Sequence, residues 1–451
     1  MNRAREALRS GDWLTRERMR LVASAVLIAS AAGFLLLVVT SHGGVDLQGR
    51  PLGTDFSNVY AAGTYVWDGN TVAAFDPPQQ FAREQAIFGP STQFYGWHYP
   101  PYFLFVAAAL SWMPYGAALA VWQAVTLGLY LLMMRGIVFP SPRARGEGGS
   151  PQDSESRIGP LTRFASLATP PRAAGRSNPD WLLLSLAFPA VLINLGHGQN
   201  GFLTAALMGG ALIVLDRRPI VAGILFGLLV YKPQYGLMLP IVLGVSGRWK
   251  CFAAAAATVV LLTIATTLTF GASVWQAFLD STHFTRTVVL EQGNTGWYKI
   301  QSIFAWARMW GAPIPLAYAL QGAATVALGA ALARLWRSAA PVPLQAAALC
   351  LATILATPYS FDYDMMLLAP AIAFVAIDGL LRGFAPWEKT LLAVLWLTPL
   401  VARSIAHISL VPLGVPIMMA VFVLILRRSE IFRGVKPLQQ TKSHDIAALK
   451  S

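Results

Sequence analysis

Charged side chains are scarce in this sequence. Asp, Glu, Lys and Arg make up 12% of its 451 residues, whereas 55% of the residues are hydrophobic. Soluble globular domains carry about 25% charged residues, so the composition excludes an ordinary soluble protein. Acidic residues are the scarcer kind, since 21 Asp and Glu stand against 34 Lys and Arg. The basic residues cluster between apolar runs, as in cytoplasmic loops of membrane proteins, and form no basic face with interleaved aromatics. We therefore expect no nucleic-acid partner.

Cysteine is nearly absent, and so are the common catalytic motifs. Cys251 and Cys350 lie at the edge of one apolar run and inside another, which is typical of small buried residues rather than of a disulfide or metal pair. There is no P-loop, no G-x-G-x-x-G after a strand, no H-E-x-x-H and no G-x-S-x-G. A nucleotide-dependent enzyme with a soluble dinucleotide domain is therefore disfavoured. A donor substrate, if there is one, should arrive through the lipid.

Long apolar runs dominate what is present. Residues 21–40 follow Arg20 directly and carry no charge, and about twenty such residues span a bilayer. A cleaved signal peptide is the rival interpretation, but no clear cleavage site follows. Many similar runs come later, so the sequence predicts an all-α polytopic transmembrane helical bundle of about 12 spans. Residues 1–20, with six Arg, form a cytoplasmic N-terminus, 21–427 the transmembrane domain, and 428–451 a cytoplasmic basic tail.

Three segments interrupt the apolar pattern. Residues 41–98 form a first outer loop, 271–312 a second, and 140–179 a disordered linker with seven Pro and six Arg. Residues 99–136 suggest two short helices broken near 113–116. Two full crossings there would put the Arg-rich linker outside, against the charge rule. Either one of the two segments is re-entrant or the linker is an exception, and the residues leave both open.

The first outer loop contains the best candidate for a catalytic residue. From Asp55 onward, apolar residues recur at helical spacing through Phe56, Tyr60 and Trp67, which predicts an interfacial helix. Asp55 at its start could act as a general base that accepts a proton from a hydroxyl nucleophile. Alternatively, it only caps the helix. Asp46, Asp68 and Asp76 of this loop are interpreted as solvated residues.

On this topology polar residues converge at the outer side of the bundle, where ionisable groups are costly unless they have a function. Lys232 could bind a phosphate as a point charge, or be a structural or snorkelling lysine. Gln199 and Asn200 could bind sugar hydroxyls or form a plain turn. The acidic pair Asp362 and Asp364 could bind substrate hydroxyls or a cation, but a lone acidic pair is weak evidence for a metal and none is expected. The predicted substrate-binding residues are His98, Tyr99, Gln199, Asn200, Lys232, Gln234, Asp362, Asp364, Arg403 and His407.

Several short motifs occur in a characteristic order. They are Asp55-Phe56 with Tyr60-Ala61-Ala62-Gly63, Trp67-Asp68-Gly69, Ala74-Phe75-Asp76, Tyr99-Pro100-Pro101 with Met113-Pro114, Gly198-Gln199-Asn200, Ala222-Gly223 before Lys232-Pro233-Gln234, and Thr357-Pro358-Tyr359-Ser360. In these motifs the chain resembles family 87 glycosyltransferases, members of the GT-C superfamily, over about residues 20–400. Where that family often places histidines, this sequence has Tyr363 and Asp364.

The resemblance implies a GT-C fold with juxtamembrane helices in the first outer loop, and Asp55 as the base of an inverting transfer. It implies a polyprenyl-phosphate sugar donor, with mannose as the expected sugar, and a lipid-linked or glycan acceptor. No cofactor is expected. The enzyme would lie in the inner (plasma) membrane, among membrane lipids, with its site facing the periplasmic side. The rival hypothesis is a polytopic transporter or lipid flippase, which helix breaks at Gly and Pro would also fit.

Overall fold

The structure is a computed structural model that describes residues 2–139 and 180–431. Within these ranges every named element is helical, and the only β pairing is in isolated bridges. The all-α prediction is therefore confirmed. The predicted linker at 140–179 and residues 432–451 of the predicted tail lie outside the described residues.

Six helices of the described chain are long and apolar enough to cross a membrane. They are α2 (Arg16–Val39), α6 (Tyr115–Val138), α13 (Trp249–Phe270), α16 (Ile314–Arg337), the 3₁₀ turn η7 (Asp362–Leu367) with α18 (Leu368–Arg382), and α19 (Glu388–Ser409). A seventh span is possible if α8 (Asp180–Leu186) and α9 (Pro189–His197), bent by 47°, count as one. The predicted count of about 12 is not confirmed, because the other apolar helices are shorter than a bilayer requires.

Five shorter apolar segments of the described chain remain, and all but the first pack among the long helices. They are η2 (Pro101–Phe103) with α5 (Leu104–Ser111), α10 (Gly201–Val214), α11 (Pro219–Leu228) with η3 (Leu229–Tyr231), η4 (Pro233–Gly236) with α12 (Leu239–Val245), and α17 (Val342–Leu355). In α17 every residue from Pro343 to Leu355 is buried. The last helix, α20 (Gly414–Ile431), packs against α17 and α19. Short helices such as α10 and α17 are tolerated at membrane depth because neighbouring protein covers most of their residues.

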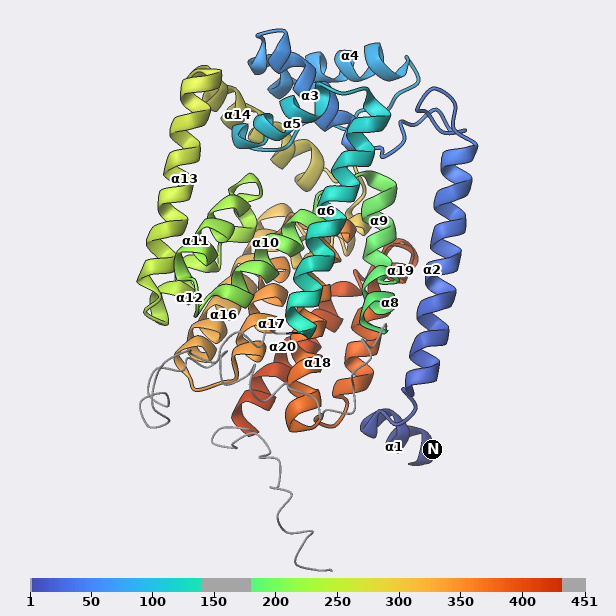
Figure 1. The fold of residues 1–451 in the computed structure, drawn as a ribbon, viewed down its shortest axis with the longest axis vertical. Helices are drawn as coiled ribbons and strands as arrows, with labels where there is room; N and C mark the ends of the chain where they lie inside the picture. Colours follow the sequence, from blue (N-terminus) through green and yellow to red (C-terminus); the bar gives the residue numbers. More distant parts are fainter. Residues whose placement is uncertain (1, 140–179, 432–451) are drawn as a thin grey trace, which may run out of the picture.

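One end of the molecule, here named the loop end, carries the non-spanning helices. It contains α3 (Phe56–Trp67), η1 (Thr71–Phe75), α4 (Pro77–Phe88), α5 and α14 (Ser273–Phe284), which lie together above the long helices (Figure 1). The Asp76 side chain accepts a hydrogen bond from the backbone N–H of Gln79 and so caps α4. Gly63 lets α3 approach α5, since a Cβ there would lie 2.1 Å from the Ala107 carbonyl oxygen. The helices predicted in the first outer loop are therefore present.

The rest of the second outer loop is also helical. After α14 come a π-helix, η5 (Thr285–Glu291), the 3₁₀ turn η6 (Trp297–Lys299) and α15 (Ile303–Met309). The contacts of α14 with η1 join the two outer loops. The two loops thus form one layer over the bundle.

The doubtful segment at 99–136 is broken as predicted, between α5 and α6. Because α5 packs on α3 at the loop end, only α6 runs through the bundle (Figure 1). Phe139 after α6 contacts Trp181 in α8, with ring centroids 6.0 Å apart. Asp180 forms ion pairs with Arg16 and Arg20 at the start of α2. The two ends that flank the predicted linker therefore lie beside the N-terminal end of α2, which agrees with the alternative of a single crossing.

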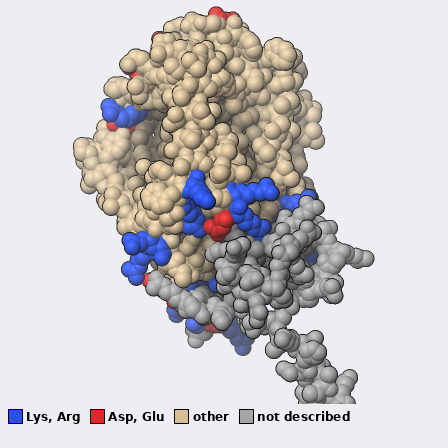
Figure 2. Space-filling model, turned by 60° about the vertical axis from the view of Figure 1, so that its left-hand side comes forward, with Lys and Arg blue, Asp and Glu red and all other residues tan. Residues whose placement is uncertain are grey.

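The opposite end, here named the terminal end, carries α1 (Asn2–Ser10) and the last turns of α20. On the face shown in Figure 2, most Lys and Arg side chains gather toward this end, below a surface with few charges. Arg428 was predicted to begin the basic tail. Instead α20 continues through it, and Arg428 is fully buried between Asp378 and Glu388. The ion pairs stabilise this position, since a buried charge without partners is costly.

Candidate functional site

Asp55 lies directly before the first residue of α3 and does not cap it. Its side chain makes no capping hydrogen bond. Instead, the Gln199 amide Nε2 donates a 2.6 Å hydrogen bond to Asp55 Oδ2. Asp55 is half-buried. Its carboxylate is therefore oriented by the turn between α9 and α10, and the capping alternative receives no support.

The turn between α9 and α10 contributes two amides to one network. Gln199 Oε1 accepts a hydrogen bond from the Tyr99 hydroxyl at 3.3 Å, and Asn200 Nδ2 donates to the same hydroxyl oxygen at 2.8 Å. All three side chains are buried. The turn is possible because Gly198 has a left-handed φ of 61°, and a Cβ there would lie 2.6 Å from the Phe56 Cβ. The segment is thus a turn whose amides also connect Asp55 to Tyr99.

His197, which was not among the predicted site residues, contacts the residue before Asp55. Its Nδ1 lies 2.7 Å from the Thr54 hydroxyl. His197 is also close enough to Asp362 for their charges to interact, as is Asp55. The sequence signal that could have identified His197 as a site residue is its position next to Gly198 and Gln199 in the turn. His197 therefore joins the Asp55 side of the site to the Asp362 side.

Lys232 and Asp364 form a buried ion pair on the other side of this network. Lys232 Nζ lies 2.6 Å from Asp364 Oδ1, and both residues are buried. The ammonium also lies 5.1 Å from the Tyr363 ring centroid and 5.5 Å from that of Tyr235. Lys232 therefore does not extend its amine to solvent, as a snorkelling lysine does. Its charge is largely compensated by Asp364, so it acts on a phosphate less strongly than an unpaired cation would.

Asp362 is paired with Arg403, a cation that is more accessible than Lys232. Asp362 Oδ1 accepts the backbone N–H of Tyr363 at 2.9 Å, and Asp362 Oδ2 lies 3.6 Å from Arg403 Nη1. The Arg403 side chain is 39% exposed. Asn194 in α9 donates to the Tyr363 carbonyl at 2.9 Å, which fixes this segment against the α9–α10 turn. Arg403 is therefore a guanidinium with only one loose ion pair beside the network.

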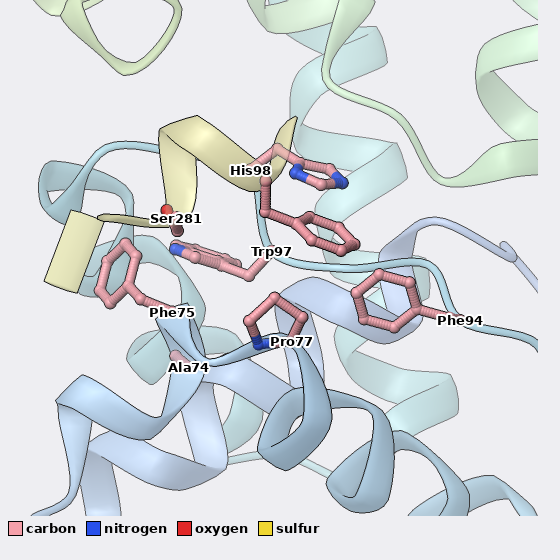
Figure 3. A pocket seen from close by; sticks show the side chains of 8 residues that line it. Ala74, Phe75, Pro77, Phe94, Trp97, His98 and Ser281 are labelled. Atoms are coloured by element: carbon pink, nitrogen blue, oxygen red, sulfur yellow. The ribbon is translucent and has the colours of Figure 1, made fainter. Parts of the chain in front are cut away.

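His98 lies in a small aromatic cavity rather than on Asp55. Its Nδ1 is 2.8 Å from the Thr285 hydroxyl. In Figure 3 the Phe75, Trp97 and Phe94 rings are spaced around the cavity, and the His98 imidazole lies at its edge. The cavity is lined by Ala74, Phe75, Pro77, Phe94, Trp97, His98, Ser281 and Phe284. Burial lowers the pKa of His98 to about 4, although the Asp55 charge acts in the opposite direction. At neutral pH the imidazole is therefore uncharged, so His98 offers no positive charge to a phosphate.

Two predicted residues lie apart from the network. His407 is exposed, and its ring contacts Tyr298 edge to face at 4.8 Å. The Arg403 guanidinium lies 6.0 Å from the centroid of the same Tyr298 ring. Gln234 is half-buried in η4. Neither His407 nor Gln234 has a described hydrogen bond to Asp55, Gln199 or Lys232, so the structure does not bring them into the site.

Metal binding has no obvious place in the described part of the chain. Within residues 2–139 and 180–431, no three His, Cys, Asp or Glu side chains gather as metal ligands. The acidic residues Asp362 and Asp364 are instead engaged by Arg403 and Lys232. Chemically, the site offers one partly exposed carboxylate, an exposed guanidinium and several hydroxyl and amide groups. This set suits proton removal from a hydroxyl beside a bound anion.

Comparison with known proteins gives one match. The family model of glycosyltransferase family 87 matches residues 97–358, which is more than half of the chain. The matched segment includes Tyr99, Gln199, Asn200 and Lys232, but it begins after Asp55. No curated protein and no solved structure matches the chain.

Proposed function

Because the chain belongs to glycosyltransferase family 87, it is a membrane glycosyltransferase, and we propose that it moves a sugar from a polyprenyl-phosphate donor to an acceptor hydroxyl with Asp55 as general base. The observation that carries this proposal is the 2.6 Å hydrogen bond from Gln199 to the partly exposed carboxylate of Asp55. A base must be oriented toward the proton it removes. The rival transporter hypothesis is not favoured, because the family match is to transferases.

The chemistry follows from one carboxylate and one leaving phosphate. An Asp55 oxygen takes the proton of the acceptor hydroxyl, and that hydroxyl oxygen forms a bond to the anomeric carbon of the sugar. The bond between the anomeric carbon and the phosphate oxygen breaks, and polyprenyl phosphate leaves with the electron pair. With attack opposite the leaving group and no covalent enzyme intermediate, the anomeric configuration inverts, as in reactions that use a general base rather than a nucleophile.

The phosphate of the donor is assigned to the Arg403 side of the site. A guanidinium forms paired hydrogen bonds with phosphate oxygens, and Arg403 is 39% exposed with its carboxylate partner 3.6 Å away. Lys232 contributes less directly, since Asp364 already neutralises it. Tyr99 and Asn200 offer polar groups to sugar hydroxyls, whereas the Gln199 amide is engaged with Asp55 and Tyr99. The polyprenyl chain would lie among the membrane helices.

The finer assignments complete the proposal. Mannose is the proposed sugar, and the acceptor is a lipid-linked or glycan hydroxyl. The protein would lie in the inner membrane with the loop end facing the periplasm. It would use no metal or organic cofactor. These assignments rest on the family resemblance and on the basic terminal end (Figure 2), which the positive-inside rule places in the cytoplasm.

The decisive experiment replaces Asp55 by Asn in the purified enzyme with polyprenyl-phosphate mannose as donor. Asp55→Asn keeps the size of the side chain and removes the base, so transfer should fall by about 10²- to 10⁴-fold. Asp280→Asn is the control, because Asp280 is an exposed aspartate of α14 in the second outer loop. Unchanged turnover in Asp55→Asn would refute the assigned base. Use of another polyprenyl-phosphate sugar by the wild type, and not of mannose, would refute only the sugar.

A further inference from the structure

Glu84 is a fully buried carboxylate outside the network described above. It lies in α4 and has 0% exposure. Within the described residues it forms no ion pair with Lys, Arg or His; its partners are three hydrogen-bond donors. The backbone N–H groups of Tyr95 and Gly96 donate at 3.0 and 3.3 Å, and Gln80 Nε2 donates at 3.4 Å. A buried carboxylate without a cation is costly, so its presence calls for a reason other than stability.

The donors of Glu84 come from two segments, α4 itself and the turn that precedes His98 and Tyr99. Gln80 Nε2 also donates to the Asn58 carbonyl at 3.0 Å, in the first turn of α3 and three residues after Asp55. Tyr95 and Gly96 precede His98 and Tyr99 in the chain. Gly96 has a φ of 67°, and a Cβ there would lie 2.9 Å from His98 Nε2. The backbone path into Tyr99 therefore depends on how this turn is fixed to α4.

Gln199 connects the same two segments a second time, since its amide donates a hydrogen bond to Asp55 and accepts one from Tyr99. We propose that Glu84 is a positioning residue for the transfer reaction: together with Gln80 it fixes the Tyr95–Gly96 backbone to the first turn of α3, so that Asp55 and Tyr99 keep the separation that Gln199 bridges. This inference rests on the proposed function, and it adds a residue that touches neither donor nor acceptor.

The ionisation state of Glu84 sets how firmly the turn is fixed. Burial raises the pKa of Glu84 to about 7, and the nearby charge of Asp55 adds to the rise. Among the described residues, the charges of Glu84, Asp55 before α3, Tyr95 on the turn itself and Tyr115 at the start of α6 act on one another. Arg50 and Asp46 act on Tyr95 as well. A carboxylate offers two acceptor oxygens to the N–H groups, whereas the protonated acid keeps only one good acceptor. The turn therefore loosens as the pH falls through the neutral range.

The test combines a pH profile with amide hydrogen exchange. In the wild type, kcat should rise from pH 6 to pH 8 with an inflection near pH 7, while the KM for the donor changes little. Glu84→Gln resembles the protonated acid in shape and charge. It should lower kcat about tenfold, the effect of one lost charged hydrogen bond, and remove the inflection. Protection of the Tyr95 and Gly96 amides should fall at low pH in the wild type and be low at all pH values in Glu84→Gln.

The matched control is Asp68→Asn. Asp68 forms an exposed ion pair with Arg83, the residue next to Glu84 on α4, so this variant removes a carboxylate charge from the same loop without touching Tyr95 or Gly96. It should keep the wild-type inflection and amide protection. The proposal is overturned if Glu84→Gln keeps the inflection, or if amide protection at Tyr95 and Gly96 does not depend on pH in the wild type. Hydrogen exchange can be measured without activity. If the wild-type protein showed no transfer, the proposed function would be refuted, and the exchange data would still test the contact of Glu84 with the Tyr95 and Gly96 amides.

Discussion

Lys232 and Asp364, 132 residues apart in the sequence, form a 2.6 Å ion pair in which both residues are buried. Asp364 Oδ2 also accepts the backbone N–H of Phe361 at 2.9 Å. Breaking a buried pair by removing one partner costs about 3–5 kcal/mol, whereas replacing both partners by apolar groups costs far less. The pair is therefore a sensitive test of how the candidate site is built.

Asp364→Asn should lower the thermal stability of the detergent-solubilised protein strongly, because it leaves the Lys232 ammonium buried without an anion. The double variant Lys232→Met with Asp364→Asn should recover most of that loss. Thermal unfolding followed by size-exclusion chromatography measures both. Equal midpoints for the single and double variants would mean that the pair does not exist in solution.

Arg403→Met should raise the KM for the polyprenyl-phosphate donor about 10- to 100-fold with little change in kcat, because a charged hydrogen bond contributes about 1.5–3 kcal/mol. Steady-state kinetics with varied donor measures this. Arg286→Met is a close control, since Arg286 is also exposed at the loop end and lies 3.6 Å from a carboxylate, that of Glu291. A similar KM increase in both variants would argue against a specific phosphate contact at Arg403.

Gln199→Leu should lower kcat about tenfold and leave the donor KM nearly unchanged, because the amide orients Asp55 through one hydrogen bond to a charged group. Gln276→Leu serves as the control, since Gln276 is exposed on α14 and its amide likewise donates a hydrogen bond to an aspartate, the exposed Asp280. Steady-state measurements of kcat and of the donor KM for both variants test this. An increase in donor KM at constant kcat would instead place Gln199 against the substrate.

The raised pKa of Glu84 also predicts how stability depends on pH. In the unfolded chain this carboxyl ionises near pH 4.5, whereas burial delays ionisation in the folded protein to about pH 7. Between these values the folded state binds more protons, so stability falls as the pH rises. The shift from 4.5 to about 7 corresponds to about 3–4 kcal/mol at most. Melting temperatures between pH 5 and 8 should decline in the wild type, and decline less in Glu84→Gln. Parallel curves would show that Glu84 ionises normally.

Local features were predictable because local patterns determine them. Apolar runs predicted the helices, Met113-Pro114 marked the break before α6, and Lys232-Pro233 marked the change from η3 to η4. The grouping of Asp55 with Gln199 and Tyr99 also followed, since all three were assigned to the same outer end of the bundle. Here topology alone was enough to bring distant residues together.

Pairings between distant side chains were not predictable. Nothing around Lys232 indicates that Asp364 would neutralise it, and nothing around His197 indicates Thr54, because both contacts depend on how helices pack. For the burial of Glu84 the sequence contains a weak signal. Gln80, Glu84 and Phe88 share one face of α4 at four-residue spacing, and all three are buried. Two polar residues on a face that includes Phe88 indicate hydrogen-bonded partners inside the protein.

The contact between Phe139 and Trp181, with the ion pairs of Asp180 to the start of α2, has a consequence for how the polypeptide can be assembled. These contacts bring together the two chain ends that flank forty intervening positions. We therefore expect two separately translated fragments, one ending near Phe139 and the other starting near Asp180, to associate in the bilayer.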